Sequence, residues 1–131
     1  MRLLLDTHIL LWRLADSDKL PVAALTLMDE HAEQLFASTG SIWEVAIKWA
    51  RRKGAADDMP LSGREFSAAL DEVGIDVLPI TPAHAAALDD LEMHHRDPFD
   101  RLLIATARCE GLTLLTSDTA LEAYGPEVRV V

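Results

Sequence analysis

The sequence has 131 residues, half of them hydrophobic and 26% charged, which is typical of one soluble globular domain over residues 1–131. The single cysteine, Cys109, excludes an internal disulfide, and no segment is long and apolar enough to span a membrane. We therefore expect a cytoplasmic protein. The formal net charge of −10 argues against broad binding to a nucleic-acid backbone and favours a bound cation or a basic partner.

Two strands and three helices are predicted in the first part of the sequence. An apolar run over residues 2–5 is typical of a strand buried on both faces, and residues 35–38 form a second such run. Helices are predicted over residues 7–14, 21–33 and 41–53, and the second of these starts at a proline, which suits the first helical position.

The second part of the sequence continues this alternation. Ser62 and Glu65 have the spacing of a capping box, which predicts a helix that ends at Gly74. Asp97 and the proline after it are a strong helix start, because aspartate caps a helix and proline suits its first turn. That helix is predicted to run to Glu110. The remaining predicted elements are a strand over residues 75–80, a short helix over 81–91, and strands over 112–116 and 127–131.

Strands that alternate with helices predict an α/β fold, a three-layer α/β/α sandwich with a central, mainly parallel sheet. Such sheets bind ligands beyond the carboxyl ends of their strands. Asp6 directly follows the first strand and Asp118 lies two residues beyond the fourth, so we expect both at the same rim. Each also has a structural explanation, because Asp6 can cap the following helix and Asp118 can cap a turn.

Two further carboxylates are candidates for that rim. Glu44 lies at capping-box spacing from Ser41 and four residues before Lys48, and taken alone this structural explanation is the stronger one. Asp97 is accounted for as a helix cap. Asp100, in the same first turn, is not needed as a cap, so it is the better functional candidate of the two.

The four acids Asp6, Glu44, Asp100 and Asp118 together indicate a metal centre. All-oxygen ligands suit Mg²⁺ or Mn²⁺ rather than zinc, and the five histidines lack the spacing of a zinc site. Such an ion can activate a water molecule and neutralise charge on a phosphoryl oxygen, which is the chemistry of phosphodiester hydrolysis. Because clustered acids repel one another, we expect added metal to raise the thermal stability.

Four segments carry a family resemblance through their order and spacing. They are Leu3–His8 (LLLDTH), Ser38–Lys48 (STGSIWEVAIK), His94–Ala107 (HHRDPFDRLLIATA) and Gly111–Asp118 (GLTLLTSD). Together they resemble the PIN-domain ribonucleases, most nearly the VapC type, which is the toxin half of bacterial type II toxin–antitoxin pairs. The resemblance covers nearly the whole chain and implies a PIN-like, doubly wound sheet with four acids at one rim.

The resemblance also implies which residues form that rim. Asp6 matches the first acid, Glu44 the second and Asp118 the last. The third falls on Asp100 through the pattern Asp-x-Leu-(Leu/Ile)-x-Ala-x-Ala. Asp97 is an extra acid that either contributes a water-mediated ligand or only caps its helix. We expect hydrogen bonds to the acids from Thr7, Ser41 and Thr116.

The reaction and the partners are implied in the same way. The activity would be Mg²⁺- or Mn²⁺-dependent endonuclease cleavage of structured RNA by a homodimer. A VapB-like antitoxin would lay a segment over the active site, often with a basic side chain among the acids. The sequence suits such a partner, because residues 54–131 contain fifteen acidic and only five basic side chains.

Three alternatives belong to other classes. A phosphatase with an aspartyl nucleophile, resembling the haloacid dehalogenase type, also has an aspartate after its first strand. It needs a second acid two residues on, where this chain has His8, and usually a late lysine, whereas Lys53 is the last lysine here. A phospho-accepting receiver domain lacks the same lysine. An inactive PIN-like module that only binds RNA or protein is not favoured, because all four acids are present.

Other basic and aromatic residues have both a structural and an RNA-binding explanation. The basic cluster Lys48, Arg51, Arg52 and Lys53 fits a solvated helix end better than a nucleic-acid contact. Trp43, Trp49 and Tyr124 can stack on RNA bases, but the two tryptophans fit the core better.

Overall fold

The protein is described by a computed structural model that covers all 131 residues. Five strands form one sheet: β1 (Leu3–Leu5), β2 (Leu35–Ser38), β3 (Asp76–Leu78), β4 (Thr113–Thr116) and β5 (Val128–Val130). Their order is β3-β2-β1-β4-β5, and every neighbouring pair is parallel. The predicted parallel sheet is therefore confirmed.

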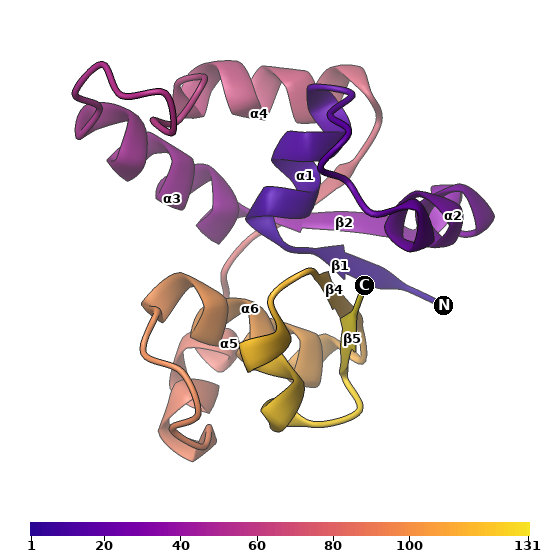
Figure 1. Ribbon diagram of the computed structural model, residues 1–131. Helices are drawn as coiled ribbons and strands as arrows, with labels where there is room; N and C mark the ends of the chain where they lie inside the picture. Colours follow the sequence, from indigo (N-terminus) through magenta and orange to yellow (C-terminus); the bar gives the residue numbers. More distant parts are fainter.

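Helices cover both faces of this sheet (Figure 1). One face carries α1 (Thr7–Leu14), α2 (Val22–Glu30), α3 (Thr39–Ala50) and α4 (Gly63–Glu72). The other carries α5 (Pro82–Ala86), α6 (Pro98–Glu110) and the 3₁₀ helices η2 (Ala87–Asp90) and η3 (Thr119–Tyr124). A further 3₁₀ helix, η1 (Ala32–Gln34), precedes β2. The three-layer α/β/α prediction is confirmed. None of the helices combines the length and apolarity that crossing a lipid bilayer requires.

The core is divided between the two faces by the alternation of side chains along the strands. Leu3 and Leu5 of β1 pack with the α1–α4 layer, whereas Leu4 packs with α6 and η3. Leu115 and Leu114 of β4 divide in the same way. Because both faces are covered, β1 is apolar throughout, as the sequence indicated, and β4 has two adjacent leucines at its centre.

The connectivity reverses beside β1, which positions the site. From β1 the chain proceeds to β2 and β3 in one direction, and then returns to β4 on the other side of β1. Parallel α/β sheets bind ligands at such a switch point, beyond the carboxyl ends of the strands. Asp6 follows β1 and Asp118 follows β4, so both lie at this rim of the sheet.

The start of α3 differs from the prediction. Ser38, at the end of β2, caps the helix by accepting a hydrogen bond from the backbone N–H of Gly40 at 2.9 Å. The helix therefore begins at Thr39 and Glu44 lies in its second turn, so the predicted Ser41–Glu44 capping box is wrong. The prediction failed because Ser38 supplies a suitable acceptor one turn earlier.

At other helix and strand boundaries, some predictions are confirmed and others differ from the structure. The Ser62–Glu65 capping box and the Asp97 cap of α6 are confirmed. Two predicted elements are shorter in the structure: α2 ends at Glu30, and β3 ends before Pro79, because proline cannot donate a ladder hydrogen bond. The helix predicted over residues 81–91 is divided into α5 and η2.

Candidate metal centre

Asp6 is held at the rim by a threonine hydroxyl. It occupies the cap position of α1, yet its side chain makes no capping hydrogen bond. Instead, Thr116 Oγ1 donates to Asp6 Oδ2 at 2.6 Å and accepts from the Asp118 backbone N–H at 3.1 Å. One hydroxyl thus connects the ends of β1 and β4, and capping does not account for this buried carboxylate.

Glu44 is buried and has a partner for each carboxylate oxygen. Thr7 Oγ1 donates to Glu44 Oε1 at 2.7 Å, and Lys48 Nζ donates to Oε2 at 2.5 Å. Thr7 Oγ1 also lies 2.8 Å from Ser41 Oγ. Of the expected hydrogen-bond partners, Thr7 and Thr116 therefore contact acids directly, and Ser41 acts through Thr7. The predicted Glu44–Lys48 pair is present, but the capping box that explained Glu44 structurally is not.

Asp97 and Asp100 divide their roles as the sequence indicated. Asp97 Oδ1 accepts hydrogen bonds from the backbone N–H groups of Phe99 at 2.8 Å and Asp100 at 3.2 Å, so Asp97 caps α6. The Asp100 side chain takes no part in capping, and its Oδ2 lies 2.9 Å from His95 Nε2.

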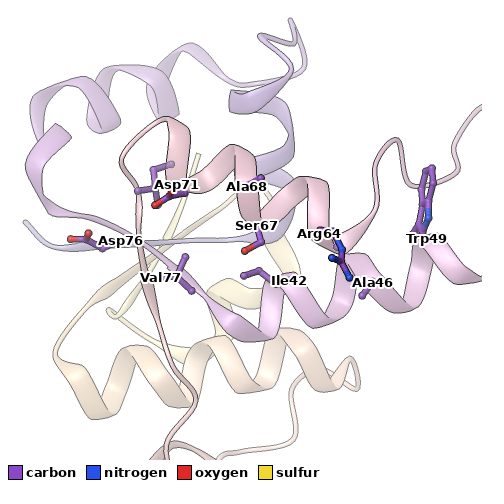
Figure 2. Close-up of a pocket in the computed structure, with 11 residues that line it drawn as sticks. Ile42, Ala46, Trp49, Arg64, Ser67, Ala68, Asp71, Asp76 and Val77 are labelled. Carbon is purple, nitrogen blue, oxygen red and sulfur yellow. The ribbon is translucent and has the colours of Figure 1, made fainter.

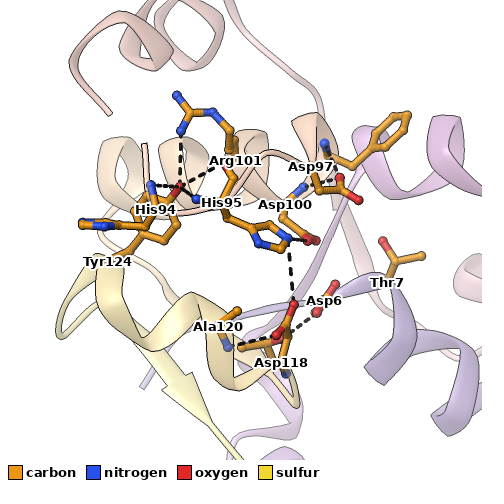
Figure 3. A network of polar contacts seen from close by, with 12 residues as sticks. Asp6, Thr7, His94, His95, Asp97, Asp100, Arg101, Asp118, Ala120 and Tyr124 are labelled. Atoms are coloured by element: carbon orange, nitrogen blue, oxygen red, sulfur yellow. Dashed lines mark hydrogen bonds and ion pairs between the residues drawn. The ribbon is translucent and has the colours of Figure 1, made fainter. Parts of the chain in front are cut away.

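His95 is the residue that sequence reasoning missed. Its Nε2 lies 2.9 Å from Asp100 Oδ2 and 4.0 Å from Asp118 Oδ2, so the imidazole lies between two of the predicted acids (Figure 3). One ligand atom from each of these three residues lies within 4.8 Å of the others. The available signal was the position of His95, two residues before the Asp97-Pro98 helix start, in a loop that leads to the rim.

Hydrogen bonds to Tyr124 hold the loop that contains His95 in place. The buried Tyr124 hydroxyl accepts hydrogen bonds from the backbone N–H groups of His94 at 3.2 Å and His95 at 2.9 Å. Arg101 donates to the same hydroxyl at 3.2 Å (Figure 3). Tyr124 is thus an internal anchor rather than a surface for base stacking.

The two carboxylate oxygens of Asp118 have different neighbours. Its Oδ1 accepts a hydrogen bond from the Ala120 backbone N–H at 2.9 Å, which caps η3 as the structural explanation predicted. Its Oδ2 is the atom nearest His95. The cap therefore orients the carboxylate without using both of its oxygens.

The negative charge of the rim is only partly neutralised by basic side chains of the protein. Burial, and then the charges of Asp6, Asp97 and Glu44, raise the pKa of Asp100 to about 7, against an opposing effect of His95. Burial also raises the pKa of Asp6, and Glu44 adds to the effect while the Thr116 hydrogen bond opposes it. Five carboxylates meet three basic side chains, Lys48, His95 and His8.

This donor set fits a hard divalent cation. Carboxylate oxygens are the preferred ligands of Mg²⁺ and Mn²⁺, and a divalent charge would offset the repulsion that, after burial, raises the pKa of Asp100. Asp100 and Asp118, together with His95, bring ligand atoms within 4.8 Å of one another. The charges of Asp6 and Glu44 act on Asp100 from the end of β1 and from α3.

The rest of the basic cluster lies apart from the acids. Arg51, Arg52 and Lys53 are exposed beyond the end of α3, as predicted for a solvated helix end. The Arg52 guanidinium stacks 3.8 Å from the centre of the Trp49 ring. Trp49 is only half-buried, and Trp43 is 56% exposed, so the prediction that both tryptophans belong to the core is wrong for Trp43.

A separate cavity of about 860 Å³ lies between α3, α4 and β3 (Figure 2). Its apolar lining includes Ile42 and Val77, and its polar lining includes Arg64 and Asp71. None of the rim acids lines it. The two helices approach closely at Gly63, where a Cβ atom would lie 2.8 Å from the Ala46 Cβ.

Comparison with known proteins agrees with this fold. The PIN domain family model matches residues 3–125. The chain belongs to the PIN domain family. Ribonuclease VapC22 of Mycobacterium tuberculosis (strain ATCC 25618 / H37Rv) is 31% identical over 122 residues, which are 92% of this chain and 90% of VapC22. This PIN domain is therefore of the VapC type.

Solved structures share the architecture of this PIN domain at low sequence identity. DNA-bound VapBC from Salmonella typhimurium has a TM-score of 0.69 at 15% identity, covering 100% of this chain and 97% of that chain. A toxin–antitoxin complex from Klebsiella pneumoniae has a TM-score of 0.67 at 19% identity, covering 97% and 95%. At such identities the similarity shows a common fold.

Proposed function

We propose that this PIN domain is a metal-dependent endoribonuclease and the toxin of a toxin–antitoxin pair. Asp6, Glu44, Asp100 and Asp118 are its proposed Mg²⁺ or Mn²⁺ ligands and catalytic residues. The observation that carries the proposal is the cluster of excess carboxylates at the sheet's switch point, where burial and the neighbouring acids raise the pKa of Asp100 to about 7. The name of the relative VapC22, a ribonuclease, supports RNA as the substrate.

The side chains around the acids hold the carboxylates in place for this chemistry. A bound Mg²⁺ or Mn²⁺ would supply an activated water molecule and neutralise charge on a phosphoryl oxygen. Thr116 and Thr7 orient Asp6 and Glu44 through hydroxyl hydrogen bonds. The Asp97 cap fixes the first turn of α6, which carries Asp100.

The proposed partners follow from the family and the charge. Structural neighbours of this chain include toxin–antitoxin complexes such as VapBC2 from Rickettsia felis. We infer a VapB-like antitoxin for this chain, with a basic side chain that approaches the acidic rim. The net charge of −10 supports such a partner. A homodimer acting on RNA in the cytoplasm completes the proposal.

The test compares wild type with Asp6→Asn, which keeps the shape of the side chain but removes its charge. Wild type should be toxic on expression and should cut RNA only with Mg²⁺ or Mn²⁺, whereas the variant should be folded, harmless and inactive. A folded variant with full activity would refute the metal site. Cleavage that persists in a chelator would refute the metal mechanism.

A further inference from the structure

A pair of aromatic rings lies where α3 meets the start of α6, and one of the two, Trp43, is exposed while Phe99 is half-buried. Trp43 of α3 and Phe99 of α6 meet edge to face, with ring centroids 5.0 Å apart and an interplanar angle of 78°. Trp43 is 56% exposed and is the one aromatic side chain among the exposed large hydrophobic residues. More than half of the Trp43 side chain is therefore open to solvent, where its ring can contact a ligand.

The chain brings this pair next to two of the proposed metal ligands. Trp43 directly precedes Glu44, and Phe99 directly precedes Asp100. Since successive helical residues point about 100° apart, Glu44 can reach the buried Thr7 hydroxyl while Trp43 remains at the surface. The two helices are close here, because a Cβ atom on Gly40 of α3 would lie 3.3 Å from Leu102 of α6.

The charge of the protein favours an uncharged contact with RNA at this place. With a net charge of −10 and acids at the rim, the surface cannot attract phosphates broadly. Stacking of a base on an aromatic ring does not depend on a positive surface and accepts any base, because every base has a π-face. A base can offer that face only when it is unpaired or splayed from a loop.

We propose that Trp43, supported by Phe99, stacks on an unpaired RNA base beside the phosphate that is cut. The contact would direct the nuclease to single-stranded positions such as loops. This inference rests on the proposed nuclease function, and the binding measurement below separates the two.

Tryptophan fluorescence tests the contact without requiring cleavage. The protein has three tryptophans, so Trp12→Phe combined with Trp49→Phe leaves Trp43 as the only one. In a chelator, a single-stranded oligouridylate should quench Trp43 emission saturably, and an RNA duplex of the same length should not. Equal quenching by the duplex, or none by the single strand, would overturn the proposal.

Variants give the second test. Trp43→Ala should weaken single-stranded RNA binding and raise KM by about 10- to 100-fold with a smaller change in kcat, whereas Trp43→Phe should retain most of the affinity. Trp49→Phe is the matched control on the same helix and should behave as wild type. Unchanged RNA affinity in a folded Trp43→Ala protein would contradict stacking. A shift from dimer to monomer at unchanged RNA affinity would instead assign the pair to a protein interface.

These results distinguish the two proposals. Selective quenching by a protein that does not cut RNA would support the stacking contact and refute the nuclease. Metal-dependent cleavage that is indifferent to Trp43→Ala would support the nuclease and refute the contact.

Discussion

The two ends of helix α6 carry charge clusters of opposite character. At its C-terminal end, Arg108 donates to the carboxylate of Glu127, to Glu92 at 3.0 Å and to the main-chain oxygen of Tyr124 at 2.7 Å. Partial burial lowers the pKa of Arg108, but the hydrogen bonds and charges of Glu127 and Glu92 outweigh this effect and raise the pKa above its usual value. At the N-terminal end, Asp97 and Asp100 belong to a group of carboxylates that basic side chains do not balance.

This difference indicates that the cluster around Arg108 is structural and that the cluster around Asp100 is suited to binding a ligand. The charges around Arg108 are satisfied by one another and fasten η3 and the loop after it to α6. The carboxylates around Asp100 repel one another, which a protein tolerates where a ligand supplies the missing charge. Substitutions at the two ends should therefore have different consequences for activity and stability.

Asp100→Asn should have the largest effect on activity. Loss of a proposed ligand should lower RNA cleavage by at least about 100-fold, the upper range for loss of a supporting hydrogen bond. The metal-free variant should melt at a higher temperature than wild type, because one charge leaves a crowded cluster. Glu92→Gln is the control, because Glu92 pairs with Arg108 at the other end of α6. This variant should leave cleavage within about twofold of wild type. Full activity in Asp100→Asn would contradict the proposal that the carboxylates at this end of α6 bind the metal.

Thr116→Val should have the next largest effect, because it removes the hydroxyl that orients Asp6. We expect cleavage to fall by about 10- to 100-fold with the fold retained. Thr106→Val is a matched control, since Thr106 is equally buried but its hydroxyl donates to the Leu102 carbonyl within α6. Equal losses in both variants would show that the Thr116 effect is general destabilisation.

The stability of the metal-free protein should fall as pH rises. The pKa of Asp100 is raised from 3.8 to about 7, so between these values the folded protein retains a proton that the unfolded chain releases. The free energy of unfolding should therefore decrease between about pH 4 and pH 7. Urea denaturation in a chelator at several pH values measures this. Asp100→Asn should flatten the dependence, and parallel curves for the two proteins would contradict the assignment.

Arg108→Lys should have the smallest effect. Lysine keeps the charge but cannot donate to Glu92, Glu127 and the Tyr124 carbonyl together, so we expect a loss of about 1 kcal/mol in stability. Cleavage should remain within about twofold of wild type. A large loss of activity in a folded Arg108→Lys protein would show that the two ends of α6 are not independent.

Local sequence signals predicted the sheet, most helices and several caps. Apolar runs identified the strands, and the Asp-Pro start separated the capping role of Asp97 from Asp100. Side-chain exposure was harder to predict, because the hydrophobic character that favoured the core for Trp43 contains no information on where α3 meets α6. The position of His95 before the Asp-Pro start was a signal for its loop, but its contacts with the acids were not predictable, since Tyr124, 29 residues away in the sequence, holds that loop.

Mn²⁺ binding, followed by electron paramagnetic resonance, tests the central claim most directly. The claim is that the carboxylates around Asp100 form an only partly neutralised cluster that a divalent cation completes. Wild type and Glu92→Gln should bind Mn²⁺ saturably with equal affinity, whereas Asp100→Asn should bind at least about tenfold more weakly. Equal binding by Asp100→Asn and wild type, or no saturable binding by wild type, would contradict the account.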